Sequence, residues 1–183
     1  NLIHVSIHAG VGAGIILDHH LYTGLAGTAG EAGHMIVQPG GRSCPCGNHG
    51  CLEQYISEPA VLSRYRELSG RTTVSIDDLV WAYNQKETAA LAVTDEFTTY
   101  LACGINNLWN LFSPECIILN SQLTAYLPQL LPEILQKLSA RFRATCQLKL
   151  STLQDTGVLL GAARVCISKY LGIEKLYFSG FQP

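Results

Sequence analysis

The sequence predicts an α/β domain built in layers, and three observations carry this prediction. Residues 2–7 alternate apolar and polar side chains, as a half-buried strand does. Residues 87–112 repeat apolar side chains at intervals of three and four, which is typical of a helix with one face on a core. Residues 115–119 form a short, largely β-branched apolar run, which predicts a central parallel strand. Helices that alternate with strands along the chain indicate the α/β class.

The first third of the chain predicts further strands and a helix. A glycine-rich turn at Gly10–Gly14 leads into an apolar strand at 15–17. A turn at Asp18–His20 then leads into Leu21 and Tyr22, which completes a β-meander. Ser57 caps a helix that carries Pro59 in its first turn and stops at Gly70.

The rest of the chain predicts mainly helices. Ser75 caps a short helix through Tyr83. A helix is expected over 123–142 in spite of two prolines, followed by a strand over 147–150. A final helix is expected from Asp155 or Thr156 through Tyr170.

The composition is that of a packed globular chain. Of 183 residues, 48% are hydrophobic and 14% are charged, and the formal net charge is −2. Lys and Arg are scattered without a basic stripe, so this chain itself is a poor candidate for nucleic-acid binding. The apolar runs are too short to cross a bilayer and no signal peptide opens the chain, so we expect no membrane insertion.

Cysteine and histidine gather between residues 34 and 51. Cys44, Cys46 and Cys51 lie on one short loop, and a structural zinc ion prefers four sulfur or nitrogen ligands in a tetrahedron. His34 is the best fourth ligand, whereas His49 sits inside the loop, where its side chain points outward more easily. The alternative is three free cysteines. A disulfide between Cys44 and Cys46 would close a small, strained ring. The odd count of seven cysteines and the metal-like cluster favour a reducing cytoplasm.

Two motifs in this region resemble the ROK family of repressors, open reading frames and kinases of sugar metabolism. They read Gly30-Glu31-Ala32-Gly33-His34 and Cys44-Pro45-Cys46-Gly47-Asn48-His49-Gly50-Cys51-Leu52-Glu53. The stretch Gly10-Val11-Gly12-Ala13-Gly14 extends the match over most of the chain. The resemblance implies the C-terminal lobe of an actin-like ATPase fold, of the ribonuclease H-like, hexokinase type, with an inserted structural zinc loop. In that family a sugar lies in the cleft between two lobes.

The resemblance also implies three sugar-binding residues. Glu31, His34 and Glu53 match the family's sugar-contacting positions in this lobe. Carboxylates accept hydrogen bonds from paired sugar hydroxyls, and a histidine with one nitrogen on zinc can offer the other nitrogen to a hydroxyl. Without the motif, Glu31 would be an ordinary loop charge and Glu53 a helix-start charge favoured by the helix dipole.

Two departures from the family's kinases favour its repressor branch. The kinases carry Gly-Thr-Gly in the first glycine turn, whereas Gly10-Val11-Gly12 has no hydroxyl, so Gly10, Gly12 and Gly14 are predicted to be the remnant of a phosphate loop. The kinases also have a glycine-rich turn after the strand at 115–119, where this chain has Asn120-Ser121-Gln122. Residues 107–115 also look like the repressor branch, which includes the N-acetylglucosamine repressor. The alternative is an ATP-dependent sugar kinase of the glucokinase or N-acetylhexosamine kinase type.

The resemblance predicts the partners of the whole protein. We expect residues 1–183 to be the sugar-sensing and oligomerising lobe of a longer protein, because the chain opens with Asn1 directly in a strand. The expected partners are a sugar or sugar-phosphate effector, a second copy in a homodimer or tetramer, and DNA bound through an N-terminal helix-turn-helix. A sugar-transport protein is a further candidate, and three aromatic residues near the C-terminus suit either such docking or a dimer: Tyr177, Phe178 and Phe181.

Overall fold

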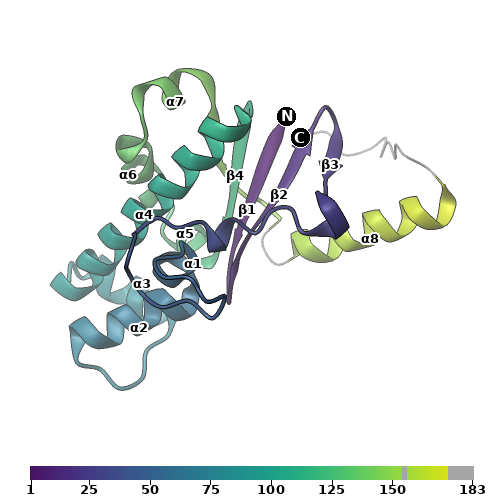
Figure 1. Ribbon diagram of the computed structural model, residues 1–183. Helices are drawn as coiled ribbons and strands as arrows, with labels where there is room; N and C mark the ends of the chain where they lie inside the picture. The colour runs from purple at the N-terminus through teal and green to yellow at the C-terminus, as the bar shows by residue number, and fades with distance from the viewer. Residues whose placement is uncertain (154–155, 173–183) are drawn as a thin grey trace. The chain divides into compact units, whose positions relative to one another are not determined.

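The computed structural model describes residues 1–153 and 156–172. The chain divides into two compact units, Asn1–Ser151 and Thr152–Pro183. The first unit holds the sheet and most of the helices, and Figure 1 traces their order along the chain. The C-terminal aromatic residues Tyr177, Phe178 and Phe181 lie outside the described residues.

A five-stranded mixed sheet forms the centre of the first unit, in the order β3-β2-β1-β4-β5. Strand β1 pairs antiparallel with β2 and parallel with β4, and β4 pairs parallel with β5. These pairings confirm the predicted meander and the predicted central parallel strand. The strands are β1 (Leu2–Ile7), β2 (Val11–Leu17), β3 (His20–Tyr22), β4 (Cys116–Ser121) and β5 (Gln147–Leu150).

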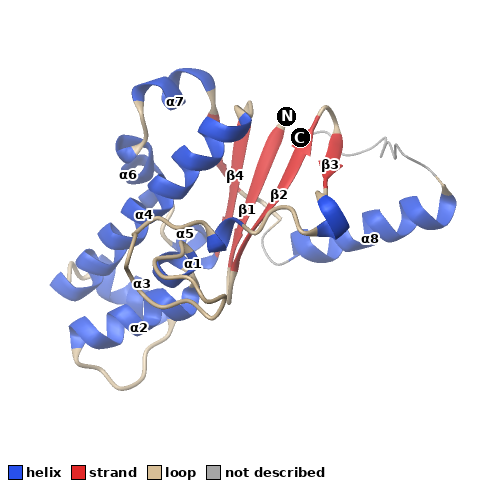
Figure 2. Ribbon diagram, viewed as in Figure 1, coloured by secondary structure: helices blue, strands red, loops and turns tan. Residues whose placement is uncertain are grey.

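The helices of the first unit gather on one side of this sheet, as Figure 2 shows. The alternation in β1 explains this arrangement, because Ile3, Val5 and Ile7 are buried and face the helices while the residues between them are only half-buried. The helices are α1 (Glu53–Ile56), α2 (Glu58–Ser69), α3 (Ile76–Asn84), α4 (Thr88–Phe112), α5 (Gln122–Tyr126), α6 (Leu130–Lys137) and α7 (Ala140–Thr145). The α/β prediction is therefore confirmed.

The predicted helix caps are present. The Ser57 side chain accepts a hydrogen bond from the Ala60 amide at the start of α2, and α2 ends at Gly70 in the left-handed conformation. Ser75 and Asp78 form a capping box on α3, in which each side chain bonds the other residue's backbone amide. These local bonds fix where α2 and α3 begin, and so they fix the frame that surrounds α1.

The single helix predicted over 123–142 is wrong, since the structure has three short helices there. A proline lacks the amide hydrogen that a helix interior needs, and Pro128 falls in the break between α5 and α6. Pro132 lies in the first turn of α6, where no intrahelical bond is lost. Ser139 starts α7 by accepting a hydrogen bond from the Phe142 amide.

The two predicted turns also lie elsewhere. The turn after β1 is His8–Gly10, and β2 begins at Val11, so Gly12 and Gly14 pair with Ser6 and His4 inside the sheet. The interpretation of Gly10–Gly14 as one loop was therefore wrong. The strand β4 continues through Asn120 and Ser121, because both pair in register with the end of β1, and α5 starts at once with Gln122.

The second unit contains α8 (Thr156–Leu171), which begins at one of the two predicted residues. In the part of the chain that the structure describes, no helix is long and apolar enough to cross a membrane.

Candidate functional site

Four potential metal ligands meet beside the sheet. The side-chain ligand atoms of His34, Cys44, Cys46 and Cys51 all lie within 4.8 Å of one another. The Cys46 and Cys51 sulfurs are 3.7 Å apart, and the Cys44 sulfur is 3.6 Å from His34 Nδ1. A tetrahedral zinc ion with bonds of about 2.3 Å to sulfur and about 2.0–2.1 Å to nitrogen implies spacings of about 3.8 Å and 3.6 Å. Two of the six spacings among the ligand atoms therefore match a tetrahedral zinc site, and the four residues could hold a metal ion.

The loop is built to bring the sulfurs together. The backbone turns tightly at Cys44–Gly47, where the Gly47 amide donates to the Cys44 carbonyl. Gly50 has a φ of 81° and passes so close to Gln38 that a Cβ would lie 1.7 Å from the Gln38 carbonyl oxygen. His49 is exposed and is not part of the ligand cluster. The geometry thus favours His34 over His49 as the fourth ligand.

The electrostatics of the cluster suit a cation. Burial and the neighbouring Cys44 and Cys46 thiols raise the pKa of Cys51 to about 12, because a buried thiolate beside two other sulfurs is unfavourable. A bound divalent metal would remove this penalty, since thiolates are the metal-binding form of cysteine. All three cysteines are free of disulfides.

The second nitrogen of His34 faces away from the sulfurs. His34 ends the 3₁₀ turn Ala32–His34, and its Nε2 lies 3.9 Å from Glu31 Oε2. Both side chains reach solvent. The His34 ring therefore has Nδ1 beside the sulfur cluster and Nε2 near the solvent-facing Glu31 carboxylate. This is the arrangement expected when a metal on one nitrogen orients the other nitrogen toward a ligand.

Glu53 comes to the site from the other side of the loop. It is the first residue of α1, two positions after Cys51, and its Oε2 accepts a hydrogen bond of 3.0 Å from the Val11 amide. A Cβ on Gly10 would lie 3.0 Å from the same oxygen, so a larger residue there would press on the carboxylate. The start of β2 thus anchors the Glu53 carboxylate.

The segment that carries Glu31 and His34 lies against the same strand. The Ala13 amide donates a 2.7 Å hydrogen bond to the Gly30 carbonyl, and a Cβ on Gly30 would lie only 1.9 Å from the Ala13 carbonyl oxygen. Strand β2 therefore holds both sides of the candidate site. A Cβ on Gly10 would crowd Glu53, whereas a Cβ on Gly12 would lie 3.9 Å from the Gly30 carbonyl oxygen, in ordinary contact.

A polar group at the carboxyl ends of β1 and β4 escaped sequence reasoning. His8 Nδ1 lies 3.4 Å from Glu58 Oε1, and His8 Nε2 lies 3.3 Å from Asn120 Nδ2. Ligands of open α/β sheets bind at this edge, so the position of His8 directly after β1 was the signal that could have found it. Its partner Glu58 could not be found in this way, because it lies fifty residues away on α2.

The chain belongs to the ROK family, whose model matches residues 1–169. It is 33% identical over 180 residues to the xylose repressor of Bacillus spizizenii. This match covers 96% of this chain and 46% of the repressor. It is 34% identical over 138 residues to the DNA-binding transcriptional dual regulator NagC of Escherichia coli. This match covers 71% of this chain and 34% of NagC. The chain spans about half the length, or less, of the curated relatives it matches. The resemblance to the family and to its repressor branch is confirmed.

Solved structures share the fold. A ROK family transcriptional regulator, a homologue of the E. coli MLC protein, has a TM-score of 0.77 at 30% identity and covers 94% of this chain and 47% of that chain. A ROK family glucokinase from Streptomyces griseus, solved with glucose and AMPPNP, has a TM-score of 0.76 at 24% identity. This match covers 90% of this chain and 59% of the glucokinase chain. The second likeness concerns the fold alone. Together they support an actin-like ATPase fold for this lobe.

Proposed function

We propose that this chain is the effector-sensing and oligomerising lobe of a ROK-type transcriptional repressor of sugar metabolism. The observation that carries the sensing role is the double engagement of His34, with Nδ1 toward the cysteine sulfurs and Nε2 toward Glu31. The repressor role is supported by the identity to the xylose repressor and to NagC. The ligand is a sugar or sugar phosphate.

In this proposal, zinc is structural. His34, Cys44, Cys46 and Cys51 would fill all four positions, so no open position remains for a reacting water. When bound, the metal fixes the tautomer and orientation of His34, which leaves Nε2 for a sugar hydroxyl. Glu31 and Glu53 would accept hydrogen bonds from further hydroxyls.

The alternative, an ATP-dependent kinase, is disfavoured by the polar groups around the β1–β2 turn. His8-Ala9-Gly10 has no hydroxyl, so the kinase-type turn is missing at the turn's true position as well. The Val11 amide, a donor that a phosphate could use, is already bonded to Glu53. Glu58 adds a second carboxylate near the turn, and Asn120 and Ser121 are buried where the kinases have glycine. Both carboxylates disfavour the phosphates of ATP at this turn.

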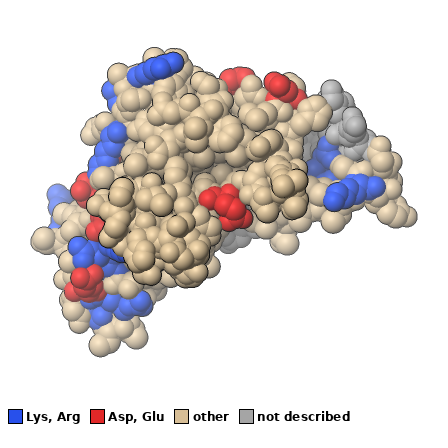
Figure 3. All heavy atoms as spheres, viewed as in Figure 1, with Lys and Arg blue, Asp and Glu red and all other residues tan. Residues whose placement is uncertain are grey.

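DNA binding is proposed for a part of the protein outside this chain. On the face in Figure 3, basic side chains are spread among acidic ones and form no stripe. An N-terminal helix-turn-helix would bind the operator, and a homodimer or tetramer would match the operator's symmetry. A sugar-transport protein is a further candidate partner.

Calorimetry on the full-length protein tests the sugar site. We expect Glu53→Gln to lower sugar affinity about tenfold or more, because a hydrogen bond to a charged group contributes about 1.5–3 kcal/mol. Glu67→Gln, which changes an exposed carboxylate on α2, is the matched control and should bind as the wild type does. Equal affinity in Glu53→Gln would remove that residue from the site.

A coupled kinase assay tests the alternative. We expect no ATP-dependent phosphorylation of glucose, N-acetylglucosamine or N-acetylmannosamine by the full-length protein. Turnover within the usual enzyme range of about 1–10³ per second would overturn the repressor proposal.

A further inference from the structure

Arg42 makes more contacts between the zinc loop and α1 than its place in the sequence suggests. It lies two residues before Cys44, and its backbone amide donates a 3.0 Å hydrogen bond to the Tyr55 hydroxyl. Its guanidinium donates through Nη1 to the Gln54 carbonyl at 2.8 Å and stacks 4.5 Å from the centre of the Tyr55 ring. Arg42 therefore contacts both Gln54 and Tyr55, the two residues that follow Glu53.

Helix α1 depends on such contacts, because it is only four residues long. One turn of helix does not hold itself together in water. Tyr55 and Ile56 are buried in the core, whereas Glu53 and Gln54 are half-buried and point outward from it. The Gln54 side chain also reaches the loop, where Nε2 donates to the Cys44 sulfur at 3.7 Å. The orientation of Glu53 thus follows from how the loop holds this turn.

The guanidinium of Arg42 is itself fixed by a carboxylate from a long helix. Glu96 on α4 accepts from Arg42 Nη2 with Oε1 and from Arg64 Nε with Oε2, and only 22% of its side chain is exposed. Arg64, on α2, also bonds the exposed Glu67. One glutamate therefore holds two arginines, and of these Arg42 also donates a hydrogen bond to α1, at the Gln54 carbonyl.

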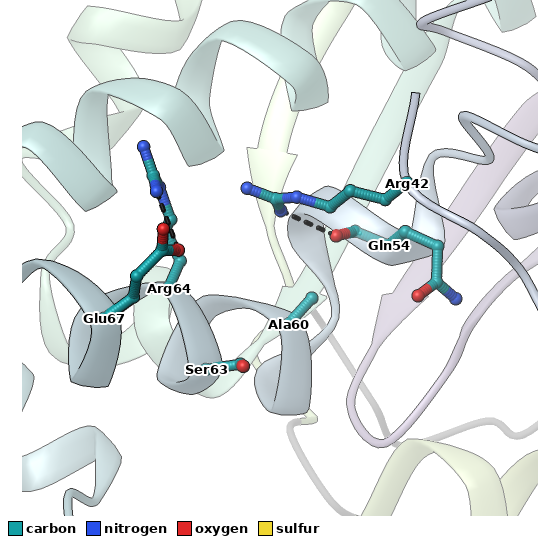
Figure 4. A pocket seen from close by; sticks show the side chains of 6 residues that line it. All are labelled: Arg42, Gln54, Ala60, Ser63, Arg64 and Glu67. Carbon is teal, nitrogen blue, oxygen red and sulfur yellow. Dashed lines mark hydrogen bonds and ion pairs between the residues drawn. The ribbon is translucent and has the colours of Figure 1, made fainter. Parts of the chain in front are cut away.

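A hollow lies beside Arg42 and leaves one side of its side chain without close packing. The cavity has a volume of about 150 Å³ and lies between the loop and α2. Figure 4 shows Arg42 reaching over Gln54, with the small side chains of Ala60 and Ser63 on the opposite wall. Arg64 and Glu67 complete the lining, and the contacts that hold the guanidinium are its bonds to Gln54 and Glu96 and its stack on Tyr55.

We infer that Arg42 is a positioning residue: held by Glu96, it fixes α1 against the zinc loop and so keeps the Glu53 carboxylate on the Val11 amide, in the place where it would meet the sugar. This inference deepens the proposed function and rests on it for the sugar. The positioning of Glu53 itself does not depend on sugar binding and can be measured without a ligand.

Arg42→Gln and Arg64→Gln in the full-length protein form a matched pair. Each removes one of the two partners of Glu96, but only Arg42→Gln also frees the Gln54 carbonyl. Three quantities would be measured: zinc per chain, sugar affinity by calorimetry, and hydrogen exchange by mass spectrometry on peptides that span 8–13 and 52–57. Arg42→Lys is the second variant if Arg42→Gln does not fold, since lysine keeps the charge but cannot fork between Gln54 and Glu96.

The expected result separates the two arginines. In Arg42→Gln the two peptides should exchange about tenfold faster and sugar affinity should fall about tenfold, with one zinc per chain retained. Arg64→Gln should leave the exchange and the affinity unchanged. Unchanged exchange in Arg42→Gln, or equal changes in both variants, would overturn the inference. Faster exchange in Arg42→Gln together with a wild type that binds no sugar would uphold the positioning role and contradict the proposed function.

Discussion

The central sheet and the loop that carries the cysteine cluster are neighbours but are stabilised in different ways. In the sheet, apolar side chains such as Ile3 and Ile117 pair across β1 and β4 and are completely buried. The loop over 35–52 has almost no regular structure, and two isolated bridges and a few turns hold its backbone. The ligand cluster and the side-chain contacts of Arg42 add to these backbone bonds.

This difference implies that the stability of the sheet and sugar sensing at the loop depend on different contacts. We expect the strands to stay paired without the metal, although the fold as a whole becomes less stable, because no strand contributes a residue to the cluster. We expect the loop to keep its shape when the core in β4 is reduced, because charged hydrogen bonds from Arg42 to Gln54 and Glu96 also hold it. Since all three proposed sugar-binding residues lie within or beside the loop, sugar sensing should follow the state of the loop rather than the stability of the sheet.

The largest effect is expected from breaking the loop. Cys51→Ser should lose the zinc ion and lower the melting temperature clearly, because a structural metal site contributes folding free energy directly. Metal analysis and thermal unfolding would measure both. Cys103→Ser, which changes a half-buried cysteine outside the cluster, should keep one zinc per chain. A Cys51→Ser protein that still holds one zinc would show that the ligand set is wrong.

A substitution in the core should lower the stability of the fold but leave the zinc content unchanged. Leu119→Ala opens a cavity in β4 and should destabilise the fold by about 2–5 kcal/mol, as buried Leu-to-Ala changes do, while the zinc content stays at one per chain. Denaturant unfolding measures the free energy. Leu111→Ala on α4, where the side chain is 75% exposed, should change it by no more than about 0.5 kcal/mol. Zinc loss in Leu119→Ala would mean that the two regions are not independent.

The smallest effect concerns the half-buried face of β1. Burial and the charge of His8 lower the pKa of His4 in the folded state. As the pH falls through the ordinary histidine value of 6.5, the unfolded chain therefore takes up a proton that the folded chain does not, and stability is lost. His4→Gln should lose less stability than the wild type between pH 7.5 and pH 5.5 in urea unfolding, and the exposed His19→Gln should behave as the wild type. An identical loss in His4→Gln would contradict this.

The sequence predicts which four residues form the His and Cys cluster, because these residues are local. His34 and the three cysteines lie within eighteen residues, so loop closure alone brings them together. The caps at Ser57 and Ser75 are equally local, and both are present. The alternation in β1 is local too, which is why its bounds match.

Other features depend on partners far along the chain. The glycines at 10–14 look like a turn, but pairing with β1 places Gly12 and Gly14 inside a strand. Asn120 and Ser121 also look like a turn in the sequence. Both pair in register with β1, and so β4 extends through them. Arg42 and Glu96 are 54 residues apart, and no spacing rule joins them. Long-range pairing decides these cases, and a single sequence does not display it.

The central claim, that this lobe senses a sugar for a repressor, is tested most directly by DNA binding. The full-length protein would be used to select its operator from genomic fragments, and the affinity for that DNA would be measured with and without xylose, glucose or N-acetylglucosamine. We predict that one of these sugars changes the affinity by about fivefold or more, the usual range of coupling between two sites. Glu53→Gln should bind the DNA equally well but lose the response to sugar. DNA binding that no sugar changes, or a protein that binds no DNA and phosphorylates the sugar, would contradict the claim.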